Sequence, residues 1–93
     1  MENRTRIRKR YCFYGRVQGV GFRYVAYHAA MSAGATGWVR NEYDGSVMLE
    51  IQGTPAQVDQ VVCSLSNGRY IRIDRTESCD LPYEEDERSF RVR

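Results

Sequence analysis

A short segment near the start of the chain, from Gly15 to Arg23, combines the residue types that bind an anion. It holds three glycines and ends in an arginine. Glycine allows successive backbone N–H groups to turn toward one centre, which forms a concave anion site. A helix beginning near Phe22 would add its free N–H groups and the positive end of its dipole, and the guanidinium of Arg23 would add paired donors. The segment therefore predicts a pocket for a phosphate or a carboxylate.

Other phosphate-binding motifs do not fit this segment. A Walker-type loop ends in Gly-Lys-Ser/Thr, and the chain has no such run. A dinucleotide-binding fingerprint needs a third glycine where Tyr24 stands, and it belongs to a doubly wound sheet that needs a longer chain. Spacing alone leaves one alternative open, a glycine-rich turn that only packs and is followed by a surface arginine.

Hydrophobic periodicity indicates the elements that position this segment. Residues 11–14 are aromatic-rich and predict a strand that Gly15 ends. Apolar residues recur at helical spacing from Phe22, and Gly34 is a typical helix stop. Residues 36–41 then predict a strand. Because the glycine-rich segment joins a strand to a helix, its backbone N–H groups can face the helix start.

The second half of the chain repeats the order of strand and helix. Residues 42–45, Glu-Tyr-Asp-Gly, predict a hairpin loop, and alternating apolar residues over 47–52 predict a strand with one buried face. Thr54, Pro55 and Gln57 form a capping box with proline at the first helical position. Asn-Gly at 67–68 closes this helix. Strands from residue 71 to about 79 and over 90–93 complete the chain.

This order predicts an α+β fold, a ferredoxin-like βαββαβ two-layer sandwich. Two helices cannot cover both faces of so small a sheet, so both should pack on one face of an antiparallel sheet. We expect a basic N-terminal arm over residues 1–7 and a single domain over residues 8–93. The fold alone does not determine a function.

Length and composition exclude several classes of protein. A chain of 93 residues with a net charge of +2 suits one domain and not an enzyme with a separate cofactor module. The apolar content of 42% excludes a disordered chain, and the sequence predicts neither a membrane span nor a secretory leader. We expect a cytoplasmic protein. Basic residues over 4–10 favour a solvated arm that enters an edge strand, although such an arm could also contact nucleic acid.

Metal and thiol chemistry find little support. Cys12, Cys63 and Cys79 form no CxxC pair, and His28 is the only histidine, so no standard zinc pattern exists. We expect no cofactor and free thiols, with one bridge and one remaining thiol as the open alternative. His28 is more typical of a surface or half-buried position than of a catalyst.

Two segments of the chain resemble the signatures of the acylphosphatase family. The first is Gly15-x-Val17-Gln18-Gly19-Val20-x-Phe22-Arg23. The second is Gly37-Trp38-Val39-Arg40-Asn41-x-x-x-Gly45-x-Val47, with Gly53 following. With residues 72–75 and the last strand, the resemblance covers nearly the whole chain after the basic arm. One departure lies after the second helix, where family members often carry Gly/Ser-Pro and this chain has Asn-Gly-Arg-Tyr at 67–70.

The resemblance implies an enzyme that hydrolyses the carboxyl–phosphate bond of acyl phosphates without a metal. It implies that Arg23 binds the phosphate and that Asn41 positions the attacking water. The backbone N–H groups expected to complete the phosphate site belong to Arg16, Val17, Gln18, Gly19, Val20 and Gly21. The partner is then a small acyl phosphate, and we expect a monomer that binds neither nucleic acid nor membrane.

The residue types suit this reaction by themselves. The leaving group of an acyl phosphate is a carboxylate, which is stable as an anion and needs no general acid, whereas an ester leaves as an alkoxide. An arginine, an amide and backbone donors can position water and stabilise phosphoryl charge. Two rival functions are a single-stranded RNA-binding module that uses Tyr11 and Phe13, and an anion sensor without catalysis. The expected third strand lacks the aromatic residues such an RNA module needs.

Overall fold

The helices and strands follow the predicted order. In the computed structural model, which describes residues 6–93, they are β1 (Ile7–Arg16), α1 (Phe22–Ala33), β2 (Thr36–Asn41), β3 (Val47–Gly53), α2 (Pro55–Leu65), β4 (Arg72–Leu81) and β5 (Phe90–Val92). Local sequence explains both helices. Gly34 ends α1 in the left-handed conformation, with φ of 77°. Thr54 and Gln57 form the reciprocal capping box at the start of α2. Most of the predicted basic arm lies outside the described residues.

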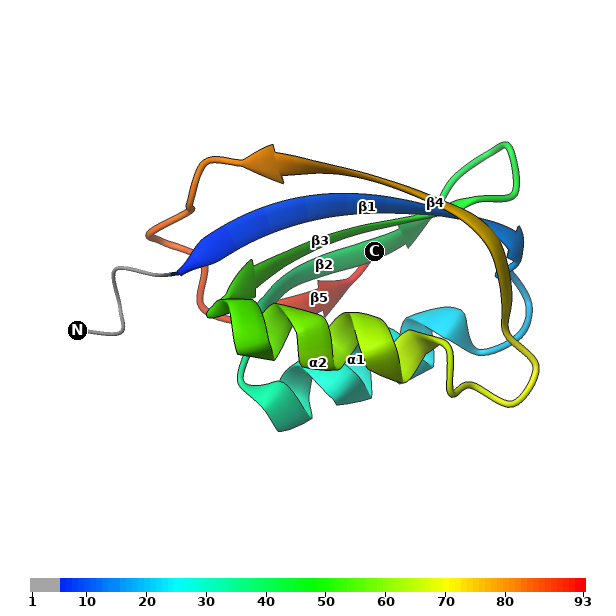
Figure 1. The fold of residues 1–93 in the computed structure, drawn as a ribbon, viewed down its shortest axis with the longest axis horizontal. Helices are drawn as coiled ribbons and strands as arrows, with labels where there is room; N and C mark the ends of the chain where they lie inside the picture. The colour runs from blue at the N-terminus through cyan, green and yellow to red at the C-terminus, as the bar shows by residue number, and fades with distance from the viewer. Residues whose placement is uncertain (1–5) are drawn as a thin grey trace.

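The five strands form one sheet in the order β4-β1-β3-β2-β5, and both helices lie on the same side of it (Figure 1). Three of the four strand pairs are antiparallel, but β5 runs parallel to β2. The expectation of a wholly antiparallel sheet is therefore wrong at this edge. The topology gives the reason, because β4 ends at the end of the sheet where β2 begins, so the returning chain enters β5 in the direction of β2.

The core lies between the sheet and the two helices. Its largest fully buried apolar side chains include Phe13, Phe22, Leu49, Ile51, Leu65 and Val39. Alternation along β3 places Val47, Leu49 and Ile51 on the helix side, as predicted. Of the described residues, neither helix combines the length and apolar character that crossing a membrane requires. The buried sheet face and the helices thus form a rigid platform for the loops at their ends.

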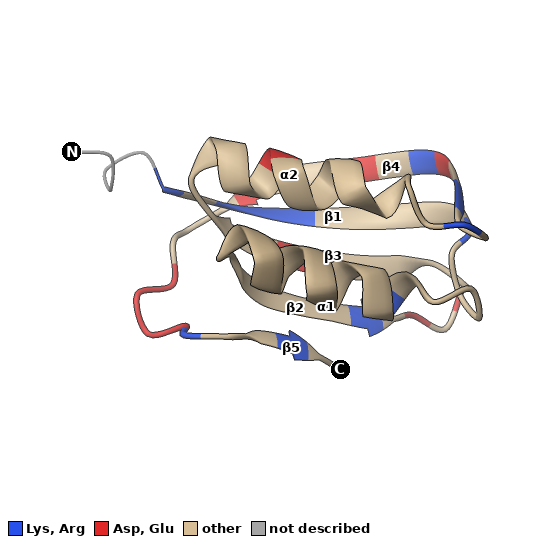
Figure 2. Ribbon diagram, turned by 90° about the horizontal axis from the view of Figure 1, so that it is seen from below, with Lys and Arg blue, Asp and Glu red and all other residues tan. Residues whose placement is uncertain are grey.

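The other face of the sheet carries an ion cluster that joins the two ends of the chain. Arg8 Nη2 lies 2.9 Å from Glu50 Oε1, and Arg8 Nη1 lies 2.8 Å from Glu87 Oε1. Arg10 Nη2 lies 2.7 Å from the second oxygen of Glu50. Figure 2 shows that the acidic connection between β4 and β5 lies at the end of the sheet where β1 starts. We call Arg8, Arg10, Glu50 and Glu87 the ion cluster.

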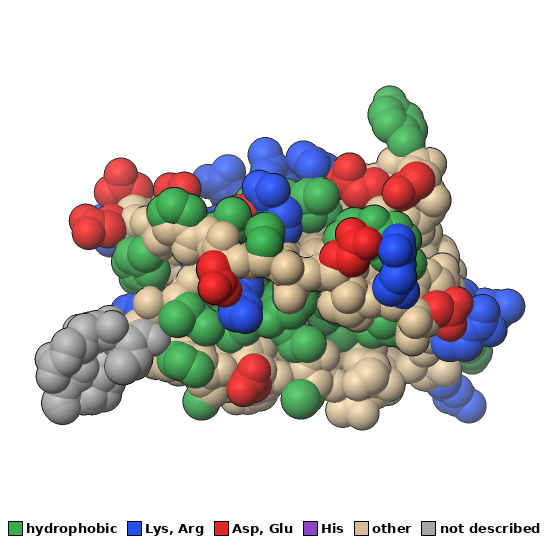
Figure 3. Space-filling view, turned by 45° about the horizontal axis from the view of Figure 1, so that its top comes forward, with side chains coloured by type: hydrophobic (Ala, Val, Ile, Leu, Met, Phe, Trp, Pro, Cys, Tyr) green, Lys and Arg blue, Asp and Glu red, His purple; other side chains and the backbone are tan. Residues whose placement is uncertain are grey.

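The ion cluster corrects the expectation of a basic edge strand. Strand β1 lies between β4 and β3, so it is an inner strand, and Arg8 is only 4% exposed. A buried guanidinium requires carboxylate partners, and these come from residues 42 and 79 positions away along the chain. Figure 3 shows other basic and acidic side chains next to one another on the surface. Local runs of charged residues in the sequence do not predict ion pairs between residues so far apart.

The stacking residues of the RNA-binding alternative point into the molecule. Phe13 is buried, and Tyr11 packs against the core with its ring 5.7 Å from that of Phe13. RNA-binding modules of this fold stack bases on the open face of the sheet. Neither aromatic side chain is therefore available for that role.

Candidate active site

The loop between β1 and α1 takes the conformation that its glycines permit. Gly19 and Gly21 have φ of 73° and 82°, in the left-handed region. A Cβ atom added at either position would meet nothing within 4 Å. The requirement for glycine at these two positions is therefore one of backbone conformation and not of space. Left-handed residues within a turn allow neighbouring N–H groups to face one centre, as in an anion-binding loop.

The start of helix α1 opens onto the same loop. Gly21 is the N-cap, and no side chain caps the helix by a hydrogen bond. No acidic residue lies in the first turn. The first N–H groups of a helix have no partner within it, and they carry the positive end of the helix dipole. An anion is the ligand that this helix end stabilises.

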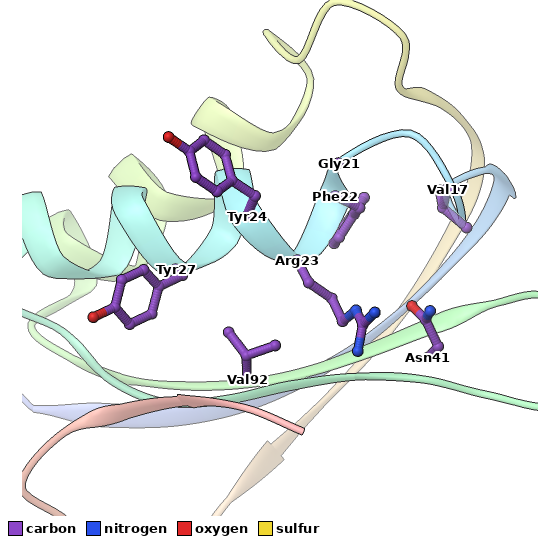
Figure 4. Close-up of a pocket in the computed structure, with 9 residues that line it drawn as sticks. Val17, Gly21, Phe22, Arg23, Tyr24, Tyr27, Asn41 and Val92 are labelled. Carbon is purple, nitrogen blue, oxygen red and sulfur yellow. The ribbon is translucent and has the colours of Figure 1, made fainter.

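A cavity of about 410 Å³ lies where the loop, α1, β2 and β5 meet. It is lined by Val17, Gly19, Gly21, Phe22, Arg23, Tyr24, Tyr27, Asn41 and Val92. In Figure 4 the side chains of Arg23 and Asn41 lie next to one another beside the loop that ends at Gly21. The structure therefore brings together five of the residues that the sequence singled out, which come from both signature segments. Of the other three, Arg16 ends β1, and Gln18 and Val20 lie in the loop without lining the cavity.

Arg23 is the second residue of α1, so the helix directs its guanidinium to the helix start. Its Nη1 donates a hydrogen bond of 3.0 Å to the backbone oxygen of Arg93. Arg93 directly follows β5, and its N–H donates a hydrogen bond of 2.8 Å to the carbonyl oxygen of Val39 in β2. The last residues of the chain thereby fix the side-chain position of Arg23. A guanidinium carries five N–H donors, so most of those of Arg23 are left for a ligand.

The side chain of Gln18 joins the loop to the hairpin that follows Asn41. Its Nε2 donates to the carbonyl oxygen of Glu42 at 2.7 Å and to that of Ser46 at 2.9 Å. These two carbonyls lie on either side of the hairpin turn. The sequence indicated only a backbone role for Gln18, because a contact between residues 24 positions apart leaves no local pattern. The bridge fixes the end of β2, and thus Asn41, relative to the glycine loop.

The carboxylates of the hairpin are engaged away from the cavity. Glu42 Oε2 lies 2.7 Å from Nε of Arg40. Asp44 Oδ1 accepts hydrogen bonds from the N–H of Ser46 at 2.9 Å and from its hydroxyl at 2.6 Å. These bonds from Ser46 lower the pKa of the Asp44 carboxyl below its ordinary value. Both carboxylates are paired within the hairpin, and neither lines the cavity.

Three residues that line the cavity were not identified from the sequence. Tyr24 and Tyr27 extend from α1, and Val92 belongs to β5. A helical pattern could have indicated Tyr27, because it lies four residues after Arg23 and thus on the same face. Nothing local indicates Val92, since its place depends on the pairing of β5 with β2. His28 is exposed, as expected, and its ring lies 4.2 Å from that of Tyr24.

Thiols and metal-binding side chains are scattered through the described part of the chain. Cys12 is half-buried, and Cys63 and Cys79 are exposed, all three as free thiols. Within residues 6–93, no three side chains of His, Cys, Asp or Glu lie close enough together to hold a metal ion. The chemistry at the cavity is that of a guanidinium, an amide and backbone N–H groups.

Comparison with known proteins identifies the family. The family model described as Acylphosphatase matches residues 9–92. The chain belongs to the acylphosphatase family. An acylphosphatase of Koribacter versatilis is 41% identical to it over 85 residues, which are 90% of this chain and 77% of that protein. An acylphosphatase of Bifidobacterium longum is 43% identical over 89 residues, 94% of this chain and 92% of that protein.

A solved structure supports the same assignment. The structure of an acylphosphatase from Coxiella burnetii superposes with a TM-score of 0.88 at 26% identity, covering 100% of this chain and 98% of that one. The chain is thus an acylphosphatase, an enzyme that acts on small acyl phosphates and hydrolyses them. Its ferredoxin-like fold agrees with the prediction from the sequence.

Proposed function

We propose that this acylphosphatase breaks the carboxyl–phosphate bond without a metal, with the phosphate bound by Arg23 and the loop and the water positioned by Asn41. The observation that carries the proposal is the meeting of both signature segments at one cavity. The glycine loop, an uncapped helix end, a guanidinium and a carboxamide adjoin the same space. Each is a group that binds phosphate oxygens or water.

The phosphate is bound by charge and by directed N–H groups. Backbone N–H groups of the loop donate hydrogen bonds to the phosphate oxygens. These N–H groups belong to Arg16, Val17, Gln18, Gly19, Val20 and Gly21. Arg23 supplies a positive charge, and its bond to the backbone oxygen of Arg93 leaves other N–H groups to bind two phosphate oxygens. Because these donors are fixed before the substrate arrives, they stabilise charge on the phosphoryl oxygens without reorganisation.

Asn41 suits the task of positioning the water. Its carboxamide oxygen accepts a hydrogen bond from the water, while its NH₂ group donates to a phosphate oxygen. An aspartate at this position would repel the phosphate. The hydrogen bonds of Gln18 to both sides of the hairpin turn keep the end of β2 at a fixed distance from the loop. Holding water and phosphorus in line lowers the barrier through orientation.

The chemistry of the leaving group explains why the site needs no acid and no metal. A carboxylate leaves as a stable anion, so no proton must be delivered to it. Phosphoryl transfer passes through a loose transition state, and positioning together with charge stabilisation accounts for most of its catalysis. The groups that line the cavity provide both.

A turnover assay tests the reaction class. Purified protein is given an acyl phosphate and, in parallel, a phosphate monoester, each with and without a strong chelator. We expect rapid hydrolysis of the acyl phosphate, at least about a hundredfold slower hydrolysis of the ester, and no effect of the chelator. Comparable rates on both substrates, or loss of activity with chelator that returned metal restores, would contradict the proposed mechanism.

A further inference from the structure

We infer that Tyr27 and Val92 form a subsite for the acyl group, and that this subsite selects acyl phosphates with an apolar, aromatic acyl group over acetyl-sized ones. The inference rests on the proposed function, since it needs the phosphate at Arg23. It begins from the extent of the cavity. At about 410 Å³, the cavity lies within the range that accommodates whole organic ligands, and a phosphate group alone leaves much of it unfilled.

The direction of the reaction assigns the two halves of the cavity. In phosphoryl transfer the attacking and leaving oxygens lie roughly in line through phosphorus. In Figure 4, Asn41 lies to one side of Arg23, and Val92 and Tyr27 lie to the other. With the water at Asn41 and the phosphate at Arg23, the leaving carboxylate points toward Val92 and Tyr27. The acyl group that it carries then lies over these side chains.

The walls of this half are apolar and fixed in place. Val92 is 48% exposed although it belongs to a paired strand, so an apolar surface faces the cavity. Tyr27 is half-buried, and its ring lies 5.3 Å from that of His28 and 6.4 Å from that of Phe90. Because these neighbours restrict the ring, an acyl group packs on it with little further loss of side-chain entropy.

The charges around the cavity also favour an uncharged acyl group. Arg23 is the only charged side chain among the residues that line it, and the phosphate occupies that guanidinium. An acyl group with a second negative charge would lose water without gaining an ionic partner. An aromatic ring, in contrast, gains from leaving water and from contact with the ring of Tyr27.

The test compares kcat/KM for benzoyl phosphate and acetyl phosphate in wild type, Tyr27→Ala and Val92→Thr. The ratio of the two substrates is compared between proteins, so their intrinsic difference in reactivity cancels. We expect Tyr27→Ala to lower the ratio about tenfold and Val92→Thr about threefold, mainly through KM for benzoyl phosphate. Tyr70→Ala is the control for loss of a tyrosine ring elsewhere on the surface, because Tyr70 is exposed and lies outside the cavity.

Two further measurements keep the result interpretable. Thermal unfolding shows that each variant is folded, and Val92→Thr preserves side-chain shape if Tyr27→Ala proves unstable. Inhibition by inorganic phosphate should be unchanged in both variants, because the phosphate half of the cavity is intact. A benzoyl-to-acetyl ratio that stays at the wild-type value in both folded variants overturns the subsite while the proposed function stands. Wild-type protein that hydrolyses neither substrate overturns the proposed function and the subsite with it.

Discussion

Two arginines of this chain, Arg8 and Arg23, differ in how fully the protein pairs them, and only Arg23 is the one that we propose binds the phosphate. Arg8 donates five hydrogen bonds to side chains of Glu50, Gln52 and Glu87. Within the described residues, the guanidinium of Arg23 donates a single hydrogen bond, to the backbone oxygen of Arg93. Arg8 is thus saturated by protein partners, whereas Arg23 is fixed at one point and keeps its other donors.

The comparison teaches that a functional cation is recognised by what its surroundings leave unpaired. Burial lowers the pKa of Arg8, but the hydrogen bonds that it donates to Glu87 and Glu50 outweigh this and raise the pKa above its ordinary value. Arg8 is therefore held in its charged form by carboxylate partners within the fold. Arg23 adjoins an uncapped helix end and N–H groups, which repel a cation unless an anion is bound between them. In the proposed function, the positive charge at Arg23 and the helix start is the property that favours a phosphate.

Of the substitutions considered, replacement of Arg23 is expected to lower the catalytic efficiency most. Arg23→Ala should lower kcat/KM for an acyl phosphate about a thousandfold, because it removes the charged donor that faces the phosphoryl oxygens. The free energy of unfolding should change by less than about 0.5 kcal/mol. Steady-state kinetics and urea unfolding measure both. Arg91→Ala is the control, because Arg91 is an exposed arginine on β5. If Arg23→Ala kept half of the wild-type turnover, Arg23 would not be the phosphate-binding residue.

Arg8→Met should produce the opposite result. It leaves Glu50 and Glu87 with fewer partners at a buried position, so the free energy of unfolding should fall by about 3 kcal/mol. The folded variant should keep its kcat/KM. Lys9→Met is the neighbouring control, because Asp80, its partner, is 85% exposed and such pairs contribute less than about 0.5 kcal/mol. Equal stability of the two variants would show that the ion cluster is not the stabilising element.

Asn41→Ala should affect turnover and not phosphate binding. We expect kcat to fall about a hundredfold, because the water loses its orientation in the transition state. The inhibition constant of inorganic phosphate should change by less than about threefold, since Arg23 and the loop are unaltered. A matched loss in both constants would indicate that Asn41 is a phosphate ligand and would leave the water without its proposed partner.

The smallest effect concerns pH and Glu50. Burial of Glu50 raises the pKa of its carboxyl, but hydrogen bonds from Arg10 and Arg8 prevail and hold the pKa below its ordinary value of 4.5. A carboxyl with a lowered pKa stabilises the fold above its unfolded pKa, and this stabilisation is lost as the pH falls through the folded pKa. Stability should therefore decline below about pH 4.5.

Urea unfolding at pH 7, 5, 4 and 3 measures this decline. In Glu50→Gln the cluster holds no titrating group at this position, so the loss of stability between pH 5 and pH 3 should be smaller than in wild type. Asp44→Asn is a second variant for the same urea series, because hydrogen bonds from Ser46 lower the pKa of Asp44 in an exposed turn. It measures how much of the pH dependence of stability comes from that carboxyl. An identical pH dependence in wild type and Glu50→Gln would contradict the role of Glu50.

The elements that local sequence determines were predictable, and those that depend on distant pairing were not. The capping box at Thr54 and the helix end at Gly34 depend only on residues close together in the sequence, so both helices could be predicted. The parallel strand β5 depends on where β4 ends, which no local pattern records. The ion cluster likewise depends on Glu87 reaching Arg8 across the sheet.

The site divides in the same way. The glycine loop, Arg23 and Asn41 could be identified because each lies in a signature segment. The bridge from Gln18 to the hairpin and the position of Val92 follow from tertiary pairing between β2 and its neighbours. The groups proposed for the reaction were therefore visible in the sequence, whereas the groups that fix them and the apolar half of the cavity were not.

The central claim is that Arg23 and the backbone N–H groups of the glycine loop surround one phosphate. Titration of ¹⁵N-labelled protein with inorganic phosphate, followed by NMR, tests it directly. We predict saturable shifts of the backbone amide signals of residues 16–21 and of the Arg23 side-chain Nε signal, all with one dissociation constant. Shifts that avoid this loop, or that are unchanged in Arg23→Ala, would contradict the account.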